Sequence, residues 1–261
     1  MAPGRPHVKK LTIKKMLDFF LKSDIIINVR TKQKQKGRKD MDYKGKYIVV
    51  DVESTNSLDD PLTYDIGFAV VDNFGKVYEQ YSYVVADIFL DKELMKSAYF
   101  ADKIPQYWKD IKEGKRELKT FFNIRKKFKE VCEKNYIWCV LAHNARFDYR
   151  ALNLTARFLT GSKVKYFFPY GVEIWDTLKM SREVLKEIDD YGEFCYNNCY
   201  LTKNLCKRYT AEIIYRWLTG NNNFEESHTG IEDVLIEKEI FKYCMEQKPE
   251  IDGLLWGRRI A

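Results

Sequence analysis

The run Tyr47 to Val52 (YIVVDV) constrains the fold of this chain more than any other segment. Its residues are apolar and mostly β-branched, which is typical of a buried central strand. The chain has 261 residues, of which 45% are hydrophobic, enough for one α/β domain with an appendage and a real core. We therefore expect a soluble α/β protein organised around this strand.

Further strands and helices follow at regular intervals. Strands are expected at Tyr64 to Val71, Val77 to Val85, Tyr136 to Ala142 and Val172 to Trp175. The turn-rich stretch Asp72 to Lys76 predicts an antiparallel hairpin, whereas a helix before the fourth strand predicts a crossover to a parallel neighbour. Helices are expected at Leu118 to Glu133, from Phe147, and at Leu178 to Ile188, Leu201 to Leu218 and Ile231 to Met245.

The positive charge of the chain lies near its N-terminus. Residues 1–46 hold 14 lysines and arginines against 4 aspartates, a net of +10, whereas residues 47–261 have a net of −3. We interpret residues 1–45 as a basic N-terminal extension and linker, with an amphipathic helix from Val8 to Ile27, and residues 46–261 as the main domain. The extension suits contact with a polyanion, although a solubilising tail is an equal alternative.

Two features bear on location and redox state. The chain has no long uncharged apolar run and no signal-peptide pattern, so we expect no membrane contact and a cytoplasmic location. Its six cysteines lie in expected strands and helices and are interpreted as free thiols. A zinc site at Cys195, Cys199 and Cys206 is less favoured than helix packing, because no paired CxxC or nearby histidine completes it.

Asp51 and Glu53 lie two residues apart at the end of the first strand. The two-residue period of a strand places both carboxylates on one face of the sheet, where they could bind one hard cation. An acidic pair at a strand end can equally be only solvated. The interpretation as a metal site therefore depends on other groups that the fold brings nearby.

A second polar group follows the strand at Tyr136 to Ala142. Asp148 lies where the chain is expected to turn into a helix, and open α/β sheets bind ligands where strands end. Asp148 could also be a helix-start acid that the helix dipole favours, and His143 and Asn144 could form an ordinary turn.

A third group precedes the last expected helix. His228 lies at or before its first turn and Asp233 lies one turn further in, so the histidine can approach whatever the aspartate binds. A lone histidine is more often structural than catalytic. Its position five residues before an acid, after the other candidate residues, favours a catalytic role.

These three groups carry a resemblance to the DEDDh 3′-to-5′ exonucleases, which include the proofreading subunit of bacterial replicative DNA polymerase, oligoribonuclease and RNase T. The matching motifs are DVEST from Asp51, HNARFD from His143 and HTGIED from His228, and WDTL from Trp175 agrees. The tyrosine branch of the family would place tyrosine at Thr229, so the histidine branch is indicated. Gly230 stands where the third motif often has alanine.

The resemblance spans about residues 46–246 and implies an RNase H-like fold, a mixed five-stranded sheet flanked by helices. It implies a site of Asp51, Glu53, Asp148 and Asp233 that holds two Mg²⁺ or Mn²⁺ ions, Asp51 bridging both. His228 would be the general base for the attacking water, and nucleoside 5′-monophosphates would be released. Thr55 and Phe147 would border the terminal nucleotide, and Asn144 would order the second motif.

Alternatives stay open at this point. The chain could be a catalytically silent scaffold that binds nucleic acid, or a proofreading subunit that differs in its protein partner and not in its chemistry. The choice between DNA and RNA depends on contacts to the 2′ position, which the motifs do not include. A protein partner or a homodimer is also left open.

Overall fold

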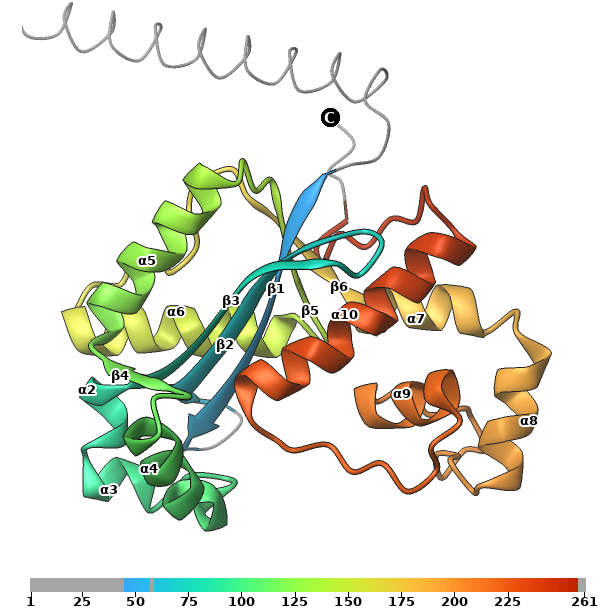
Figure 1. Cartoon of the computed structure of the whole chain (residues 1–261), viewed down its shortest axis with the longest axis horizontal. Helices are drawn as coiled ribbons and strands as arrows, with labels where there is room; N and C mark the ends of the chain where they lie inside the picture. Colours follow the sequence, from blue (N-terminus) through green and yellow to red (C-terminus); the bar gives the residue numbers. More distant parts are fainter. Residues whose placement is uncertain (1–44, 57–58, 258–261) are drawn as a thin grey trace, which may run out of the picture. The chain divides into compact units, whose positions relative to one another are not determined.

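A computed structural model describes residues 45–56 and 59–257 of the chain. In these residues a mixed sheet lies between helices (Figure 1). The predicted N-terminal extension, with its helix Val8 to Ile27, lies outside the described residues. Its boundary near Gly45 therefore stays a prediction.

The sheet has six strands in the order β4-β3-β2-β1-β5-β6. Their bounds are β1 (Lys46–Thr55), β2 (Leu62–Asp72), β3 (Val77–Val85), β4 (Glu117–Lys119), β5 (Cys139–Ala142) and β6 (Glu173–Asp176). The predicted hairpin is confirmed, because β2 pairs antiparallel with β1 and β3. The predicted crossover is also confirmed, because β5 pairs parallel with β1. The apolar run Tyr47 to Val52 thus lies in an inner strand of the sheet.

The expected number of five strands was wrong, because β4 adds a sixth. Residues Glu117–Lys119 pair parallel with the end of β3 and form a short edge strand, where a helix start was expected. The helix α5 (Phe121–Lys134) begins only after Thr120, whose hydroxyl accepts a hydrogen bond from the Asn123 backbone N–H at 3.4 Å. A three-residue edge strand has too short a pattern to be separated from the helix that follows it.

Side chains of β1 alternate between two hydrophobic clusters. Ile48, Val50 and Val52 pack with residues of α5 and α6 (Arg146–Thr160). Tyr47 and Val49 pack with residues of α7 (Thr177–Leu185), α9 (Ala211–Thr219) and α10 (Gly230–Gln247). Asp51 and Glu53 lie on the same side of the sheet as Tyr47 and Val49. Both therefore face α10, as the two-residue period of a strand predicts.

Other segments differ from the sequence expectations. Short helices that were not predicted lie between β3 and β4: α2 (Ala86–Phe89), α3 (Lys92–Met95), η1 (Ala101–Lys103) and α4 (Ile104–Lys112). The helix expected over Leu201 to Leu218 is limited to α9, because residues 201–210 are irregular and Leu205 has a positive φ of 58°. An unpredicted helix, α8 (Asp189–Asn197), precedes this stretch.

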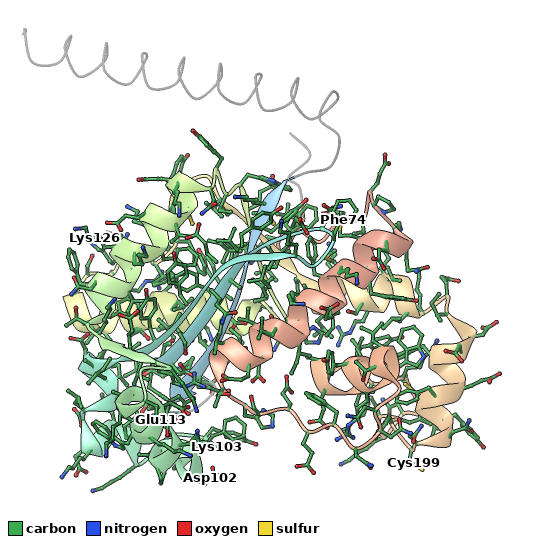
Figure 2. The ribbon with its side chains drawn as sticks, viewed as in Figure 1. Phe74, Asp102, Lys103, Glu113, Lys126 and Cys199 are labelled. Atoms are coloured by element: carbon green, nitrogen blue, oxygen red, sulfur yellow. The ribbon has the colours of Figure 1, made fainter. Side chains whose placement is uncertain are left out.

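The six cysteines are free thiols, as predicted. Cys195 is buried in α8, but Cys206 is exposed. Cys199 is also exposed (Figure 2), so helix packing accounts for only the first of the three. These cysteines do not belong to any of the possible metal-binding groups found among residues 45–56 and 59–257. Over the same residues, no helix combines the length and apolar character needed to span a membrane.

Candidate active site

The acidic pair Asp51 and Glu53 lies on β1, which is paired with β2 on one side and β5 on the other. Asp51 is opposite Gly67 of β2, and Glu53 is opposite Asp65, just before the β1–β2 register shifts. The Oδ2 atom of Asp51 is buried and has no hydrogen-bond partner among the described residues. An unpaired oxygen of this kind is costly to bury unless a ligand completes it.

Asp148 lies in the first turn of α6, beside β1. Its side chain is 3% exposed, and its Oδ1 atom has no hydrogen-bond partner in the described part of the chain. The backbone N–H groups of Asp148 and Val52 favour its charged form, yet burial raises the pKa of Asp148 to about 8. The junction before the helix is held by Asp176, whose Oδ1 atom accepts the Asn144 N–H at 2.9 Å.

The start of α10 packs directly on the sheet. A Cβ atom on Gly67 would lie 2.2 Å from the Gly230 carbonyl carbon, and one on Gly230 would lie 2.6 Å from the Gly67 nitrogen. The Gly230 N–H donates to Asp65 Oδ2 at 2.9 Å. Two facing glycines and one buried carboxylate therefore fix where α10 begins.

A buried ion-pair network surrounds Asp65. Arg116 donates to Asp65 at 3.4 Å, to Asp110 at 3.1 Å and to Glu232 at 2.6 Å, and its side chain is 2% exposed. The Tyr107 hydroxyl also donates to Asp65, at 2.7 Å. The network links β2, α4, the residue before β4 and the first turn of α10.

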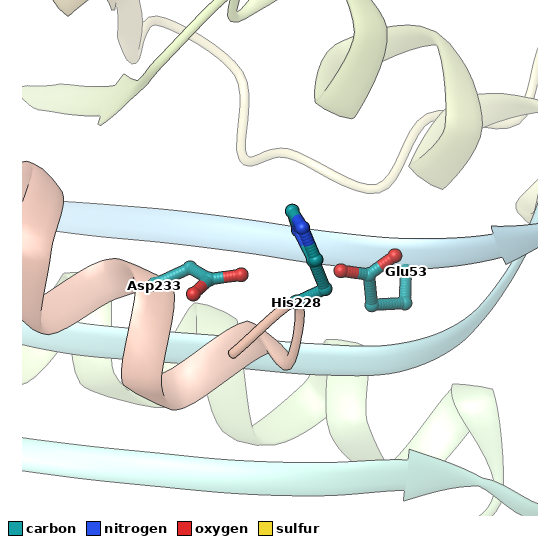
Figure 3. Close-up of side chains that lie close together, drawn as sticks. All are labelled: Glu53, His228 and Asp233. Atoms are coloured by element: carbon teal, nitrogen blue, oxygen red, sulfur yellow. The ribbon is translucent and has the colours of Figure 1, made fainter. Parts of the chain in front are cut away.

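Glu53, His228 and Asp233 come together in front of this helix start. One possible ligand atom from each of them lies within 4.8 Å of the others. The Glu53 and Asp233 carboxylates point toward each other, and His228 lies between them in this view (Figure 3). His228 has a positive φ of 51°, a backbone conformation that is uncommon outside glycine.

Burial raises the pKa of Glu53 to about 9 and that of Asp233 to about 8, and other nearby carboxylates add to both shifts. Burial also lowers the pKa of His228, although Glu212 opposes this effect. The lowered pKa favours the neutral form of the histidine beside these carboxylates.

All five predicted site residues line one cavity of about 500 Å³. The cavity is also lined by Arg182, Lys207 and Arg208, which come from α7 and the irregular segment before α9. Two of its walls therefore differ in charge, one acidic and one basic. Such a cavity suits a ligand that carries anionic groups and needs cations at its reacting end.

Comparison with known proteins supports the fold. No protein-family model and no curated protein matches the sequence. The nuclease domain of 3′hExo, a DEDDh family member bound to rAMP, matches over 80% of this chain and 96% of its own, with a TM-score of 0.55 and 12% identity. The chain has the fold of the DEDDh exonucleases. The zinc-bound complex of E. coli exonuclease I with single-stranded DNA matches over 79% of this chain and 42% of its own, with a TM-score of 0.51 and 16% identity.

The three predicted substrate-contacting residues differ in position within the DEDDh fold. Asn144 and Phe147 line the cavity. Thr55 does not: it is fully buried, and its hydroxyl donates to the Leu62 carbonyl at 3.3 Å. The prediction that Thr55 borders a nucleotide therefore finds no support in this structure. His143, from the same motif as Asn144, approaches Thr177 Oγ1 and the Tyr209 carbonyl with its two ring nitrogens.

Two residues near the site were missed by the sequence analysis. The ring of Phe100, just before η1, stacks on the ring of His228, with centroids 4.3 Å apart. Phe100 belongs to a segment with no regular pattern, so nothing in the sequence signals this contact. Glu237 of α10 lines the cavity and is 3% exposed. Its spacing of four residues from Asp233 places both on one side of the helix, and this signal could have found it.

Glu212, Glu226 and His228 form a second group whose ligand atoms lie within 4.8 Å of one another. Glu212 is engaged in an ion pair with Arg216 and accepts the Glu226 N–H at 3.3 Å. Burial raises the pKa of Glu226 to about 7, and the Glu212 charge adds to the shift. Glu226 and His228 line the cavity but Glu212 does not, and we do not assign this group to a cation because Glu212 already has a cationic partner.

Proposed function

We propose that the chain is a metal-dependent 3′-to-5′ exonuclease that releases nucleoside 5′-monophosphates from single-stranded nucleic acid. The observation that carries the proposal is the shared cavity, which the five residues of the three motifs line together. The DEDDh fold supports it, because the same fold is present in 3′hExo and in exonuclease I.

The residues fit divalent cations. Buried oxygens of Asp51, Asp148 and Glu237 have no hydrogen-bond partner among the described residues, and carboxylate oxygens are the ligands that Mg²⁺ and Mn²⁺ prefer. Asp51, Glu53, Asp148 and Asp233 would hold the cations. When bound, two such ions neutralise charge on the scissile phosphate and lower the pKa of the attacking water.

The protein side chains supply the rest of the mechanism. A ring nitrogen of His228 accepts a proton from the attacking water, and its lowered pKa keeps it neutral and able to do so. Arg182 and Arg208, on the basic wall, bind phosphate groups of the strand. Asn144 and Phe147 border the terminal nucleotide.

The test uses the full chain with matched 5′-labelled DNA and RNA single strands. In Mg²⁺ we expect a ladder that shortens from the 3′ end, abolished by EDTA and by Asp51→Asn. A Glu246→Gln variant, changed at an exposed acid of α10, should degrade the strands as the wild type does. Binding of the strands without degradation by a folded wild-type protein would overturn the proposal and indicate a silent scaffold. The same two ladders report the preference between DNA and RNA.

A further inference from the structure

Glu237 is a buried acid that none of the three motifs includes. It lies one turn beyond Asp233 on α10, and its side chain lines the cavity. Residues four apart share a helix face, so α10 presents two carboxylates to the same space. Glu237 thus approaches the site from the same element as Asp233, but deeper along the helix.

The carboxylate of Glu237 is incompletely satisfied. Its Oε2 atom is buried without a hydrogen-bond partner in the described part of the chain, although the residue is 3% exposed. Burial raises its pKa strongly, and the charges of Asp148 and Asp233 raise it further. The backbone amide of His143 favours the charged form, but no lysine or arginine is among the main influences. A structural acid in this position would normally have an ion-pair or hydrogen-bond partner for each oxygen.

Two neighbouring carboxylates of Glu237 also have a buried oxygen without a hydrogen-bond partner among the described residues. Asp51 and Asp148 each bury one oxygen without a partner among the described residues. Glu237 exerts the largest charge effect on Asp51, ahead of Asp148 and Glu53. Carboxylates from β1, α6 and α10 therefore line the same cavity as the compact group of Glu53, His228 and Asp233.

We propose that Glu237 is a further carboxylate of the cation site, acting beside Asp51 and Asp148. The inference rests on the proposed function, because that function requires the ions. The free oxygen binds the ion directly or accepts a hydrogen bond from one of its waters, and either contact raises the affinity. The added negative charge also favours a hard divalent cation over a softer one.

The test measures Mn²⁺ binding to the full chain by electron paramagnetic resonance and calorimetry, without substrate. Glu237→Gln keeps the shape of the side chain and removes its charge. We expect the affinity of the weaker of two Mn²⁺ sites to fall about tenfold to a hundredfold. Glu246→Gln is the matched control on the same helix and should bind Mn²⁺ as the wild type does.

The Asp51→Asn variant separates this inference from the proposed function. Reduced Mn²⁺ binding in Asp51→Asn with wild-type binding in Glu237→Gln overturns only the role of Glu237. Wild-type binding in both variants overturns the metal site itself, and with it the proposed function.

The melting temperature in EDTA and in Mg²⁺ gives a second test. A merely structural role of Glu237 would change the melting temperature equally in both conditions. In EDTA, Glu237→Gln should melt above the wild type, because a buried carboxyl whose charged form is disfavoured is replaced by a neutral amide. With Mg²⁺ present, the variant should gain less stability than the wild type. Equal destabilisation in both conditions overturns the inference. If Glu237→Gln does not fold, Glu237→Asp is the substitute variant, because it withdraws the carboxylate by one methylene. Unchanged Mn²⁺ affinity in Glu237→Asp would then overturn the inferred role of Glu237.

Discussion

Phe100 stacks face to face on His228, with ring centroids 4.3 Å apart and an angle of 9° between the planes. The two residues are far apart in the sequence and come from different elements. The contact covers one face of the imidazole, and one ring nitrogen lies within 4.8 Å of possible ligand atoms of Glu53 and Asp233. The stack thus restricts the rotation of a ring whose backbone is already in an uncommon conformation.

Phe100→Ala should therefore lower the turnover number about tenfold to a hundredfold. Without the stacked ring, the His228 imidazole is less well oriented to take a proton from the attacking water. KM should change little. The measurement is steady-state degradation of a labelled strand in Mg²⁺. Tyr99→Ala is the control, because Tyr99 is 82% exposed and contacts Phe100 edge-on, and Phe100→Trp should restore most of the activity. A raised KM with normal turnover would show that Phe100 binds substrate instead.

Gly230→Ala restores the residue that the third motif often has, yet we expect it to be harmful in this chain. Its Cβ atom would lie 2.6 Å from the backbone nitrogen of Gly67, and backbone cannot yield as a flexible side chain does. We expect a loss of about 1–3 kcal/mol in the free energy of unfolding. Nuclease activity should also fall, since α10 carries Asp233. Urea denaturation and the strand assay measure the two effects.

Gly192→Ala in α8 provides the comparison for this substitution. The nearest atom to its Cβ would be Lys207 Nζ at 3.5 Å, which is an ordinary contact. Replacing a helical glycine by alanine at such a position should raise the free energy of unfolding by about 0.5–1 kcal/mol. Wild-type stability and activity in Gly230→Ala would mean that the two facing glycines are not needed for the approach of α10.

Arg116→Met should destabilise the protein by about 3–5 kcal/mol, because it leaves the buried carboxylates of Asp65 and Asp110 without their cation. Lys96→Met breaks a pair of similar length with Glu93, but those side chains are 70% and 80% exposed. That control should stay within about 0.5 kcal/mol of the wild type. Equal effects of the two substitutions, measured by urea unfolding, would contradict a stabilising role for the network.

Glu79 of β3 should contribute stability that is lost in acid. Hydrogen bonds from Lys134 and Tyr81 lower the pKa of Glu79 to about 2, from an ordinary value of 4.5. Because its pKa is lower in the folded state, ionised Glu79 stabilises the folded protein above pH 4.5. This contribution to stability disappears as the pH falls toward 2. The difference in stability between the wild type and Glu79→Gln should therefore be full at pH 7 and small near pH 2. A difference that is the same at both pH values would argue against the ion pair.

Local patterns predicted the parts of the site that strands and helix starts define. The two-residue period of β1 placed Asp51 and Glu53 on one face, and the structure brings both to the cavity. The turn-rich stretch Asp72 to Lys76 predicted the hairpin of β2 and β3, and the helix before β5 predicted its parallel pairing with β1. Asp148 and His228 were found because their motifs lie at the junction of regular elements.

The remaining parts depend on packing between distant segments. Phe100 reaches His228 only because a segment of short helices folds back over the end of the sheet, and no periodic pattern encodes that. β4 is recognisable only by its pairing with β3. The spacing of Glu237 from Asp233 puts both on one side of α10, but only the packing of α10 on the sheet shows that Glu237 is buried at the cavity. Thr55 is fully buried and does not line the cavity, so its contact with the terminal nucleotide stays a prediction.

The site joins the first described strand to the last long helix. Asp51 and Glu53 precede residue 56, whereas His228, Asp233 and Glu237 follow residue 227. A ribosome adds more than 170 further residues between Glu53 and His228, by subtraction of the positions. A nascent or truncated chain that ends before Gly230 therefore has no complete site. Whatever chemistry the cavity performs, the cell is exposed to it only after α10 has been made and has docked on β2.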